Sequence, residues 1–181
     1  MMVGRELHAS EKVIPDCSAN PVLLEVKGLN RGRLVQDISF QVRAGEILGF
    51  AGLMGAGRTE VMRAIFGADR LESGQVFVHG KEVQVREPFD AVAAGIGYLS
   101  EDRKHFGLAT GMDVEANITL PSLSRWLKWK CVLNRKASYA IAQEMVAKLR
   151  IKTPSIHQLS KLLSGGNQQK VVIAKWLVRD C

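Results

Sequence analysis

The sequence is poor in the features that mark secreted, disulfide-stabilised and membrane-spanning proteins. Its 181 residues include only three cysteines, an odd number, and no Cys-x-x-Cys spacing joins Cys17, Cys131 and Cys181. We therefore expect neither a disulfide framework nor a zinc site, and a reducing compartment is the default. No apolar run approaches the roughly 20 residues that a membrane-spanning helix needs. The N-terminal segment carries charged residues from Arg5 onward and lacks the long apolar core of a secretory signal. Neither a signal peptide nor a transmembrane helix is therefore expected.

Acidic side chains are scarce in the segment 125–152. The chain has 25 basic and 18 acidic residues, a net charge of +7, and residues 125–152 hold eight basic side chains against the single acid Glu144. The excess positive charge therefore belongs to one segment and not to a whole basic domain. Because no base-reading motif accompanies it, a nucleic-acid partner is not expected. The 46% apolar and 24% charged residues are ordinary for a globular domain.

The hydropathy pattern predicts an α/β fold. Alternation of apolar and polar residues is typical of half-buried strands, continuous apolar runs of buried strands, and four-residue spacing of helices. The expected strands are 22–26, 37–42, 46–51 and 96–99, together with a hairpin formed by 76–78 and 83–85. The expected helices are 59–66, 113–120, 135–150 and 171–178, with Asn134 as an N-cap and Gly67 after the first helix.

A glycine-rich loop, Gly-Leu-Met-Gly-Ala-Gly-Arg-Thr, occupies residues 52–59 between an expected buried strand and an expected helix. Glycines allow positive φ, so successive backbone N–H groups can point at one anion, and the helix start adds a favourable dipole. The hydroxyl of Thr59 can ligate a Mg²⁺ ion that bridges terminal phosphates. The pattern indicates a phosphate-binding loop; the alternative is a structural strand-to-helix turn.

One position of this loop departs from the usual phosphate-loop pattern, because Arg58 stands where a lysine is expected. Lysine is a compact charge on a thin stem, whereas arginine is a broad planar fork. The Arg58 side chain can reach phosphate oxygens, but its guanidinium cannot take the same position as a lysine ammonium. The alternative is that Arg58 is a surface side chain beside a structural turn.

A second motif, Leu-Ser-Gly-Gly-Asn-Gln-Gln-Lys, begins at Leu163 and precedes an apolar helix. Ser164 is placed to cap that helix, and Gly165 and Gly166 leave its first amides uncovered. An uncovered helix start favours anions. For the motif by itself, a capped structural helix is a substantial alternative.

Taken together and in this order, the two motifs resemble those of an ABC-transporter ATPase, with a Walker A loop followed by a signature motif. Three longer stretches, GEILGFAGLMGAGRTEVMRAIFGADR, YLSEDRKHFGL and LLSGGNQQKVVIAKWL, resemble the second ATPase cassette of the ATP-binding subunit of bacterial monosaccharide importers, of the ribose, xylose and galactose type. The resemblance implies an α/β P-loop NTPase fold of the ABC type. Such a cassette has a RecA-like core, an antiparallel β subdomain and a helical subdomain, and here we expect it to be incomplete at the C-terminus.

The resemblance also implies a division of the chain. Residues 1–22 would be a linker between cassettes, and 23–112 the β subdomain with the first part of the P-loop core. Residues 113–162 would be the helical subdomain, and 163–181 the signature motif with its helix. The Walker B aspartate and the catalytic glutamate of the family follow the signature helix. We therefore expect no catalytic residue within this chain and negligible hydrolysis by the chain alone.

The resemblance also implies which residues of this chain form the nucleotide site, position by position along the family's motifs. The residues implied to bind ATP are Gly52, Gly55, Ala56, Gly57, Arg58, Thr59 and Glu60, with Thr59 also bound to Mg²⁺ through the nucleotide. Glu101 occupies the position of the glutamine of the Q-loop, and its alternative role is one charge in an exposed Glu-Asp-Arg-Lys run. The signature residues are Leu163, Ser164, Gly165, Gly166, Asn167 and Gln168, implied to contact ATP bound to an opposite cassette.

The implied cofactors are ATP and Mg²⁺, and the implied function is coupling of ATP binding and hydrolysis to monosaccharide uptake. The implied partners are the first ATPase cassette, the transmembrane permease subunits and, indirectly, a periplasmic sugar-binding protein, at the cytoplasmic face of the inner membrane. The alternative is an inactive, truncated module that binds nucleotide or docks on a partner. Two features remain open: residues 28–33 lack the aromatic that stacks on adenine in many relatives, and Trp126 and Trp129 are either partner contacts or packed.

Overall fold

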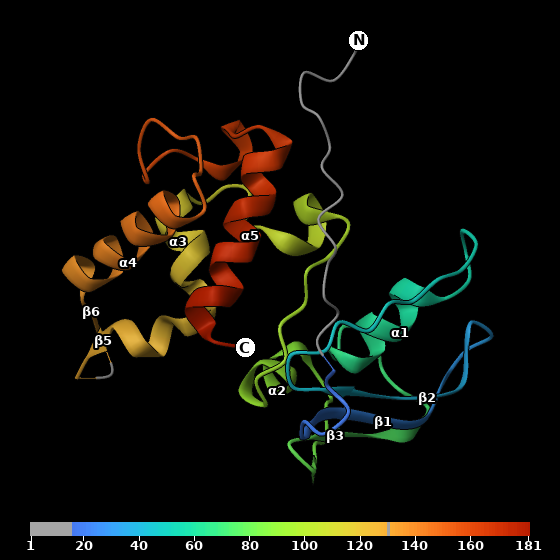
Figure 1. Ribbon diagram of the computed structural model, residues 1–181. Helices are drawn as coiled ribbons and strands as arrows, with labels where there is room; N and C mark the ends of the chain where they lie inside the picture. Colours follow the sequence, from blue (N-terminus) through green and yellow to red (C-terminus); the bar gives the residue numbers. More distant parts are fainter. Residues whose placement is uncertain (1–15, 130) are drawn as a thin grey trace.

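An antiparallel sheet of four strands organises the N-terminal half of the molecule (Figure 1). The computed structural model describes residues 16–129 and 131–181. Strand β1 (Val22–Arg31) pairs with β2 (Val35–Arg43) on one side and with β3 (Ser73–Val78) on the other, and β3 pairs with β4 (Lys81–Glu82). The strand order is therefore β2-β1-β3-β4.

The predicted strands 22–26 and 37–42 are confirmed and extend further than expected. The predicted hairpin is also present, but its second strand is β4 at Lys81–Glu82 and not 83–85. The reason is a tight turn at His79 and Gly80, whose φ angles of 51° and 74° pair Val78 directly with Lys81. Two consecutive residues with positive φ are typical of the two-residue hairpin turn that fits twisted strands.

Helix α1 (Arg58–Ile65) covers one face of this sheet. Val61 and Ile65 of the helix pack on Val26, Leu29 and Val76 of the strands, and all five side chains are buried. The helix ends as expected: Phe66 is the C-cap, and the next residue, Gly67, has a φ of 74°. Glycine reaches this left-handed conformation without the steric cost that a Cβ imposes.

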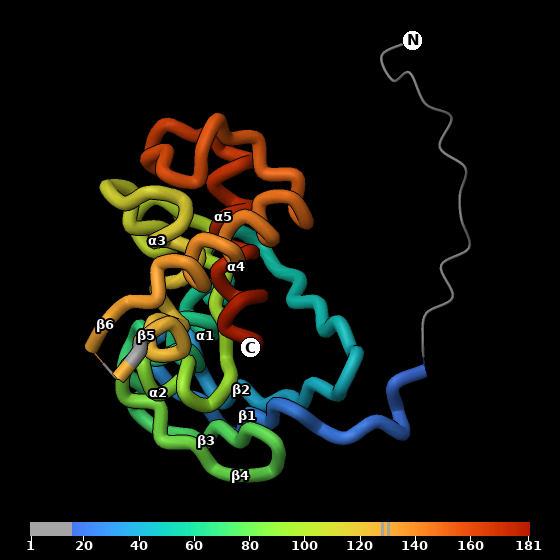
Figure 2. Tube along the Cα trace, turned by 90° about the vertical axis from the view of Figure 1, so that its left-hand side faces the viewer, coloured from blue at the N-terminus to red at the C-terminus, as the bar shows by residue number. Residues whose placement is uncertain are grey.

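The C-terminal half is helical and has a core of its own (Figures 1 and 2). Its regular elements are α3 (Val114–Thr119), α4 (Arg135–Lys148), α5 (Gly165–Arg179), the 3-10 helices η2 (Leu120–Trp126) and η3 (Ser160–Leu162), and the small hairpin of β5 (Leu127–Lys128) and β6 (Val132–Leu133). Two shorter elements, α2 (Pro88–Ala93) and the π-helical turn η1 (Arg103–Gly107), precede them.

Helix α5 lies at the centre of the helical core. Its buried residues Val171 and Val172 share one cluster with Val114 and Ile118 of α3 and with Met145 of α4. The starts of α3 and α4 carry side-chain caps. The Asn134 side chain accepts from the Ala137 amide, as predicted, and the Asp113 side chain accepts from the Ala116 amide at 2.8 Å.

The prediction of buried strands at 46–51 and 96–99 was wrong. Neither segment is a strand, and Ile47 is 97% exposed. In Figure 2 the teal segment after β2 runs apart from the sheet before it turns into α1. A strand forms only where a neighbouring backbone accepts and donates its ladder of hydrogen bonds. Among the described residues no other segment pairs with either of these two. Without a partner strand, both segments are irregular and partly exposed.

None of the helices in the described residues is both long and apolar enough to span a bilayer.

Candidate functional site

The glycine-rich loop of residues 52–57 leads directly into α1, as the sequence predicts. Gly55 and Gly57 have φ angles of 83° and 82°, in the left-handed region that favours glycine. The two glycines are needed for different reasons. A Cβ on Gly57 would collide with the backbone carbonyl of Leu34, whereas a Cβ on Gly55 would enter open space.

The start of α1 is not covered by any side-chain cap, and its N-cap residue is Gly57. The first N–H groups of a helix have no partner within the helix, and they carry the positive end of its dipole. Arg58 and Thr59 occupy the first turn. The Arg58 side chain folds back over the loop, with its Nη2 3.5 Å from the carbonyl oxygen of Leu53. Uncapped amides, a guanidinium and a hydroxyl therefore belong to the same helix turn, and all of them are donors that a phosphate group can accept from.

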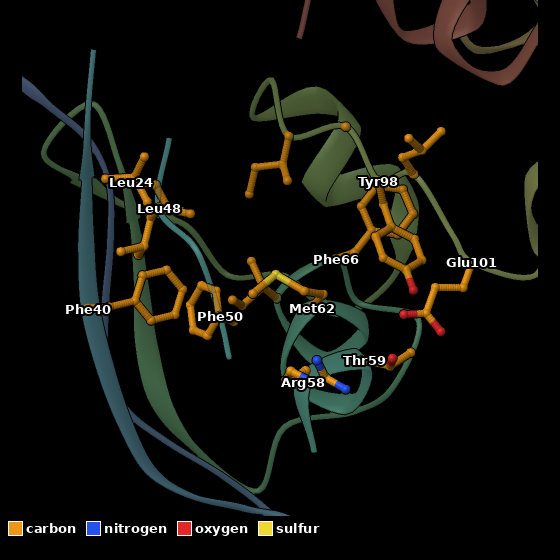
Figure 3. A pocket seen from close by; sticks show the side chains of 15 residues that line it. Leu24, Phe40, Leu48, Phe50, Arg58, Thr59, Met62, Phe66, Tyr98 and Glu101 are labelled. Carbon is orange, nitrogen blue, oxygen red and sulfur yellow. The ribbon is translucent and has the colours of Figure 1, made fainter. Parts of the chain in front are cut away.

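A cavity of about 470 Å³ adjoins this helix start (Figure 3). One end is polar and is formed by Arg58, Thr59 and Glu101; the other is apolar and includes Phe40 and Phe50. The two aromatic rings meet edge to face, with centroids 5.0 Å apart. Residues from β2, α1 and the segment 96–101 thus enclose one space.

Glu101 and Thr59, which are far apart in the sequence, line the same side of this cavity (Figure 3). Glu101 itself is exposed. Carboxylate and hydroxyl oxygens are ligands that Mg²⁺ accepts, so the chemistry of this end fits a divalent cation as well as the phosphates that accompany it. The remaining loop residues of the expected set, Gly52 and Ala56, are exposed, and Glu60 lies in the first turn of α1.

The signature residues lie at the start of α5, in the other half of the molecule. Ser164 is the N-cap of this helix, as predicted, but its side chain forms no capping bond. Its hydroxyl instead accepts from the Asn167 side-chain amide at 3.0 Å. That arrangement corrects the expected capping role and leaves the first amides of α5 open. Asn167 also accepts from the Lys152 amide at 2.9 Å, which holds the preceding loop to the helix.

The two motifs do not form one site within the chain. Among the described residues that line the cavity at α1, none comes from 163–168. Leu163 and Gln168 face inward and are buried, whereas Ser164 is exposed. The start of α5 therefore does not contribute to the cavity beside the phosphate loop of its own chain.

Sequence reasoning missed two polar residues that organise the helical half. Asn117 is buried, and its side-chain amide donates to the Ala109, Met112 and Asp113 carbonyls and to the Ser160 hydroxyl. Arg103 reaches the start of α5, where its Nε lies 3.3 Å from Oε1 of Gln168. Asn117 lies in no motif, and Arg103 is only one charge of the Glu-Asp-Arg-Lys run, because both residues act through contacts that the fold brings together.

The open question on the two tryptophans is resolved differently for each. Trp126 packs against the helical core and donates its Nε1 proton to the Ser122 hydroxyl at 3.2 Å. Trp129 is 87% exposed. Packing therefore explains the first tryptophan, and the second remains a candidate for contact with a partner.

A glycine loop before α1, an apolar helix opened by Leu-Ser-Gly-Gly and an antiparallel sheet beside a helical half define the class of ATP-binding cassettes. The family model described as ABC transporter matches residues 35–181, and the chain belongs to this family. The fold agrees with solved cassettes. It superposes with a TM-score of 0.69 on a dimeric cassette captured after hydrolysis with ADP and Pi, at 17% identity, over 87% of this chain and 70% of the other. A nucleotide-free cassette gives a TM-score of 0.66 at 18% identity, over 87% of this chain and 65% of that one.

The particular relatives are named as ATP-binding proteins of sugar import. The chain is 71% identical over its whole length to a putative ribose/galactose/methyl galactoside import ATP-binding protein of Albidiferax ferrireducens, and it covers 36% of that protein. It is 51% identical over 98% of its length to a ribose import ATP-binding protein of Rubrobacter xylanophilus, of which it covers 35%. The chain thus spans about a third of the length of the curated relatives it matches.

Proposed function

We propose that the chain is a nucleotide-binding part of the ATP-binding subunit of a bacterial monosaccharide importer. In the whole protein this part helps to couple ATP binding and hydrolysis to sugar uptake. The observation that carries the proposal is the uncapped start of α1, where Gly55 and Gly57 adopt positive φ beside Arg58 and Thr59. High identity to named sugar-import proteins supports the substrate class.

The residues of the loop take distinct roles in this proposal. The backbone amides of residues 57–60 at the start of α1 hold the terminal phosphates of ATP, and Arg58 adds a positive charge at the loop. Thr59 and Glu101 offer oxygen ligands toward a Mg²⁺ ion, which when bound neutralises charge on the phosphates. Gly52 and Ala56 shape the turn that precedes the helix.

The signature residues serve a second nucleotide. Ser164, Gly165 and Gly166 present a helix start that has no side-chain cap and does not line the cavity at α1, so we assign them to ATP held by the first cassette. Leu163, Asn167 and Gln168 fix that helix start from within. The partners are therefore the first cassette, the permease subunits, with residues 113–162 as the docking subdomain, and indirectly a periplasmic binding protein. This places the assembly at the cytoplasmic face of the inner membrane.

A titration of the chain with MgATP, compared with MgAMP, tests the nucleotide-binding proposal. Because the loop recognises the terminal phosphates, MgATP binds at least about tenfold more tightly than MgAMP, the equivalent of one charge-assisted contact. Calorimetry measures both affinities. Equal affinities, or no saturable heat at millimolar MgATP, contradict the proposal and leave the alternative of a module that docks on partners without nucleotide.

A further inference from the structure

The hairpin of β5 and β6 exposes apolar side chains at one end of the helical half. In Figure 1 this hairpin lies at the edge of that half, on the side away from the four-stranded sheet. Trp129, which directly follows β5, is 87% exposed, and Val132 and Leu133 of β6 are exposed as well. These three side chains form an apolar surface that the described part of the chain leaves uncovered.

The base of this hairpin is fixed to the helical core. The Asn134 amide donates to the Trp126 carbonyl at 2.6 Å and closes the hairpin, and Trp126 packs against the core. Just before it, the Arg125 guanidinium donates to the Val178 carbonyl of α5 at 3.0 Å. Because both ends of the hairpin are held, a contact through Trp129 costs little ordering of its backbone.

The charge around this hairpin is of one sign. Residues 125–143 include five basic residues and no acidic one. Arg135 and Lys136 are exposed in the first turn of α4, where the helix dipole disfavours cations. Neither forms a salt bridge with an acid of residues 16–129 or 131–181. Helix stability therefore does not account for these two cations, whereas an anionic partner does.

Two acids line the pocket beside the start of α4, but both are engaged in hydrogen bonds within the fold. Asp113 accepts from the Ala116 amide at 2.8 Å. Glu115 accepts from the Ser138 hydroxyl at 2.6 Å. Their side chains are 29% and 15% exposed. They therefore offset little of the positive charge that the start of α4 presents to solvent.

The composition of the segment distinguishes between kinds of partner. Lys128 and Lys130 flank Trp129 in the sequence, and three of the five basic residues in 125–143 are lysines. Lysine is depleted at protein–protein interfaces. A bilayer surface combines tryptophan at the level of the headgroups with lysine and arginine beside anionic lipids. The segment therefore fits a lipid surface better than it fits the surface of another protein.

We propose that this hairpin and the first turn of α4 bind a membrane surface that contains anionic lipids. The Trp129 ring lies at the boundary between headgroups and acyl chains, and Arg135 and Lys136 lie against lipid phosphates. One aromatic anchor with a few cations gives reversible binding and not insertion. The contact is separate from the nucleotide site, so the inference goes beyond the proposed function and does not depend on it.

Binding of the chain to vesicles tests the charge requirement. Mixed vesicles contain phosphatidylcholine and phosphatidylglycerol in equal parts, and the comparison vesicles contain phosphatidylcholine alone. In co-sedimentation the wild type binds the mixed vesicles at least about tenfold more tightly, because each cation near an anionic surface contributes about fivefold. Equal binding to the two kinds of vesicle, or binding to neither, overturns the proposal.

Two alanine variants test the tryptophan. Trp129→Ala weakens binding to the mixed vesicles about tenfold, since no ring then enters the apolar boundary. Phe89→Ala removes a ring that is also exposed, at 73%, but lies in α2, and it leaves binding unchanged. Because both rings are exposed, neither substitution removes a core contact. Equal affinities of the two variants overturn the role of Trp129.

A matched pair of charge variants separates this surface from net charge. Arg135→Gln/Lys136→Gln removes two exposed cations at the start of α4. Arg33→Gln/Lys81→Gln removes two exposed cations beside the four-stranded sheet. The first double variant binds mixed vesicles at least about tenfold more weakly than the wild type, and the second stays within about twofold. Equal weakening of both overturns the proposal, because net charge alone then accounts for binding.

Fluorescence quenching by lipids brominated on their acyl chains reports whether the Trp129 ring enters the bilayer. Quenching is strong in the wild type and mostly lost in Trp129→Phe, because Trp126 and Trp176 pack within the fold. Phenylalanine keeps an apolar ring, so this variant still binds within about threefold of the wild type. Equal quenching in the two proteins overturns the placement of Trp129.

A protein partner gives a different result in the same assay. Binding of the wild type only to vesicles that also carry the permease subunits overturns the proposal and assigns Trp129 to a protein contact. Binding to mixed vesicles without any other protein supports the lipid surface. Nucleotide is omitted throughout, so each of these results leaves the proposed function unchanged.

Discussion

The carbonyl oxygen of Leu34 lies against Gly57, so close that no side chain fits between the turn preceding β2 and the phosphate loop. Gly57 is buried, and it is also the N-cap of α1 in the left-handed conformation. The sheet therefore fixes where the helix begins. Because the loop's amides belong to that helix start, the β1–β2 turn sets the position of the candidate anion site.

This relationship predicts a difference between two glycine variants of the loop. Gly55→Ala suffers only the cost of a left-handed residue, about 1–2 kcal/mol. Gly57→Ala suffers that cost plus a collision with backbone, and we expect a loss of at least about 3 kcal/mol. Urea unfolding measures both free energies. Equal losses for the two variants contradict the contact with Leu34.

Two tryptophans provide a test of hydrogen bonding in the helical half. Trp126 donates to Ser122, whereas the buried Nε1 of Trp176 has no hydrogen-bond partner among residues 16–129 and 131–181. Substitution by phenylalanine removes ring volume from both but a hydrogen bond from only one. Trp126→Phe therefore destabilises the chain by about 1 kcal/mol more than Trp176→Phe, as measured by chemical unfolding. The reverse order contradicts the assignment.

Asn117 is predicted to be the most sensitive polar residue of the helical half. It is buried, and its side chain accepts from the Ala109 amide and donates to the Ser160 hydroxyl, both at 2.9 Å. Asn117→Ala leaves buried partners unsatisfied and lowers the free energy of unfolding by about 3 kcal/mol or more. Asn20→Ala, which removes one partly buried bond to the Ala44 carbonyl, is the matched control and costs about 1 kcal/mol. Thermal unfolding that ranks the two variants equally contradicts the network.

Stability is predicted to fall in acid through Asp69. Its carboxylate accepts from Arg63 at 2.8 and 2.9 Å, and these hydrogen bonds, with a smaller effect of charge, hold the pKa of Asp69 below its usual value. A lowered carboxyl pKa contributes stability above the unfolded-state pKa of about 3.9, and this contribution is lost as pH falls through the folded-state value. Asp69→Asn is therefore less stable by about 2 kcal/mol at neutral pH, and the difference shrinks below about pH 4. A difference that stays constant with pH refutes this origin.

Local signals allowed much of the fold to be predicted. A short apolar stretch located the start of β1, and alternation located β2. Asn134 marked the start of α4, and Gly67 marked the end of α1. The segments 46–51 and 96–99 were mispredicted because an apolar run indicates only that a strand can form. It does not indicate that a partner strand lies beside it.

Some residues of the candidate site could be predicted from local sequence, and others could not. The loop of residues 52–59 and the start of α5 follow from glycine and cap positions, which are local. Contacts such as Arg103 with Gln168, or the shared cavity of Thr59 and Glu101, join residues from distant parts of the chain. No single-residue pattern carries that information, because it arises only when the elements pack.

The central claim is that the phosphate loop binds the terminal phosphates of ATP, with Thr59 serving the metal ion. Thr59→Val keeps the shape of the side chain and removes its hydroxyl; Thr153→Val, on an exposed loop of the helical half, is the control. The most direct measurement is the ATP affinity of the three proteins with Mg²⁺ and with a chelator. Wild type and Thr153→Val bind at least about fivefold more tightly with Mg²⁺, whereas Thr59→Val loses this gain. An equal gain from Mg²⁺ in all three proteins, or no ATP binding by the wild type, contradicts the account.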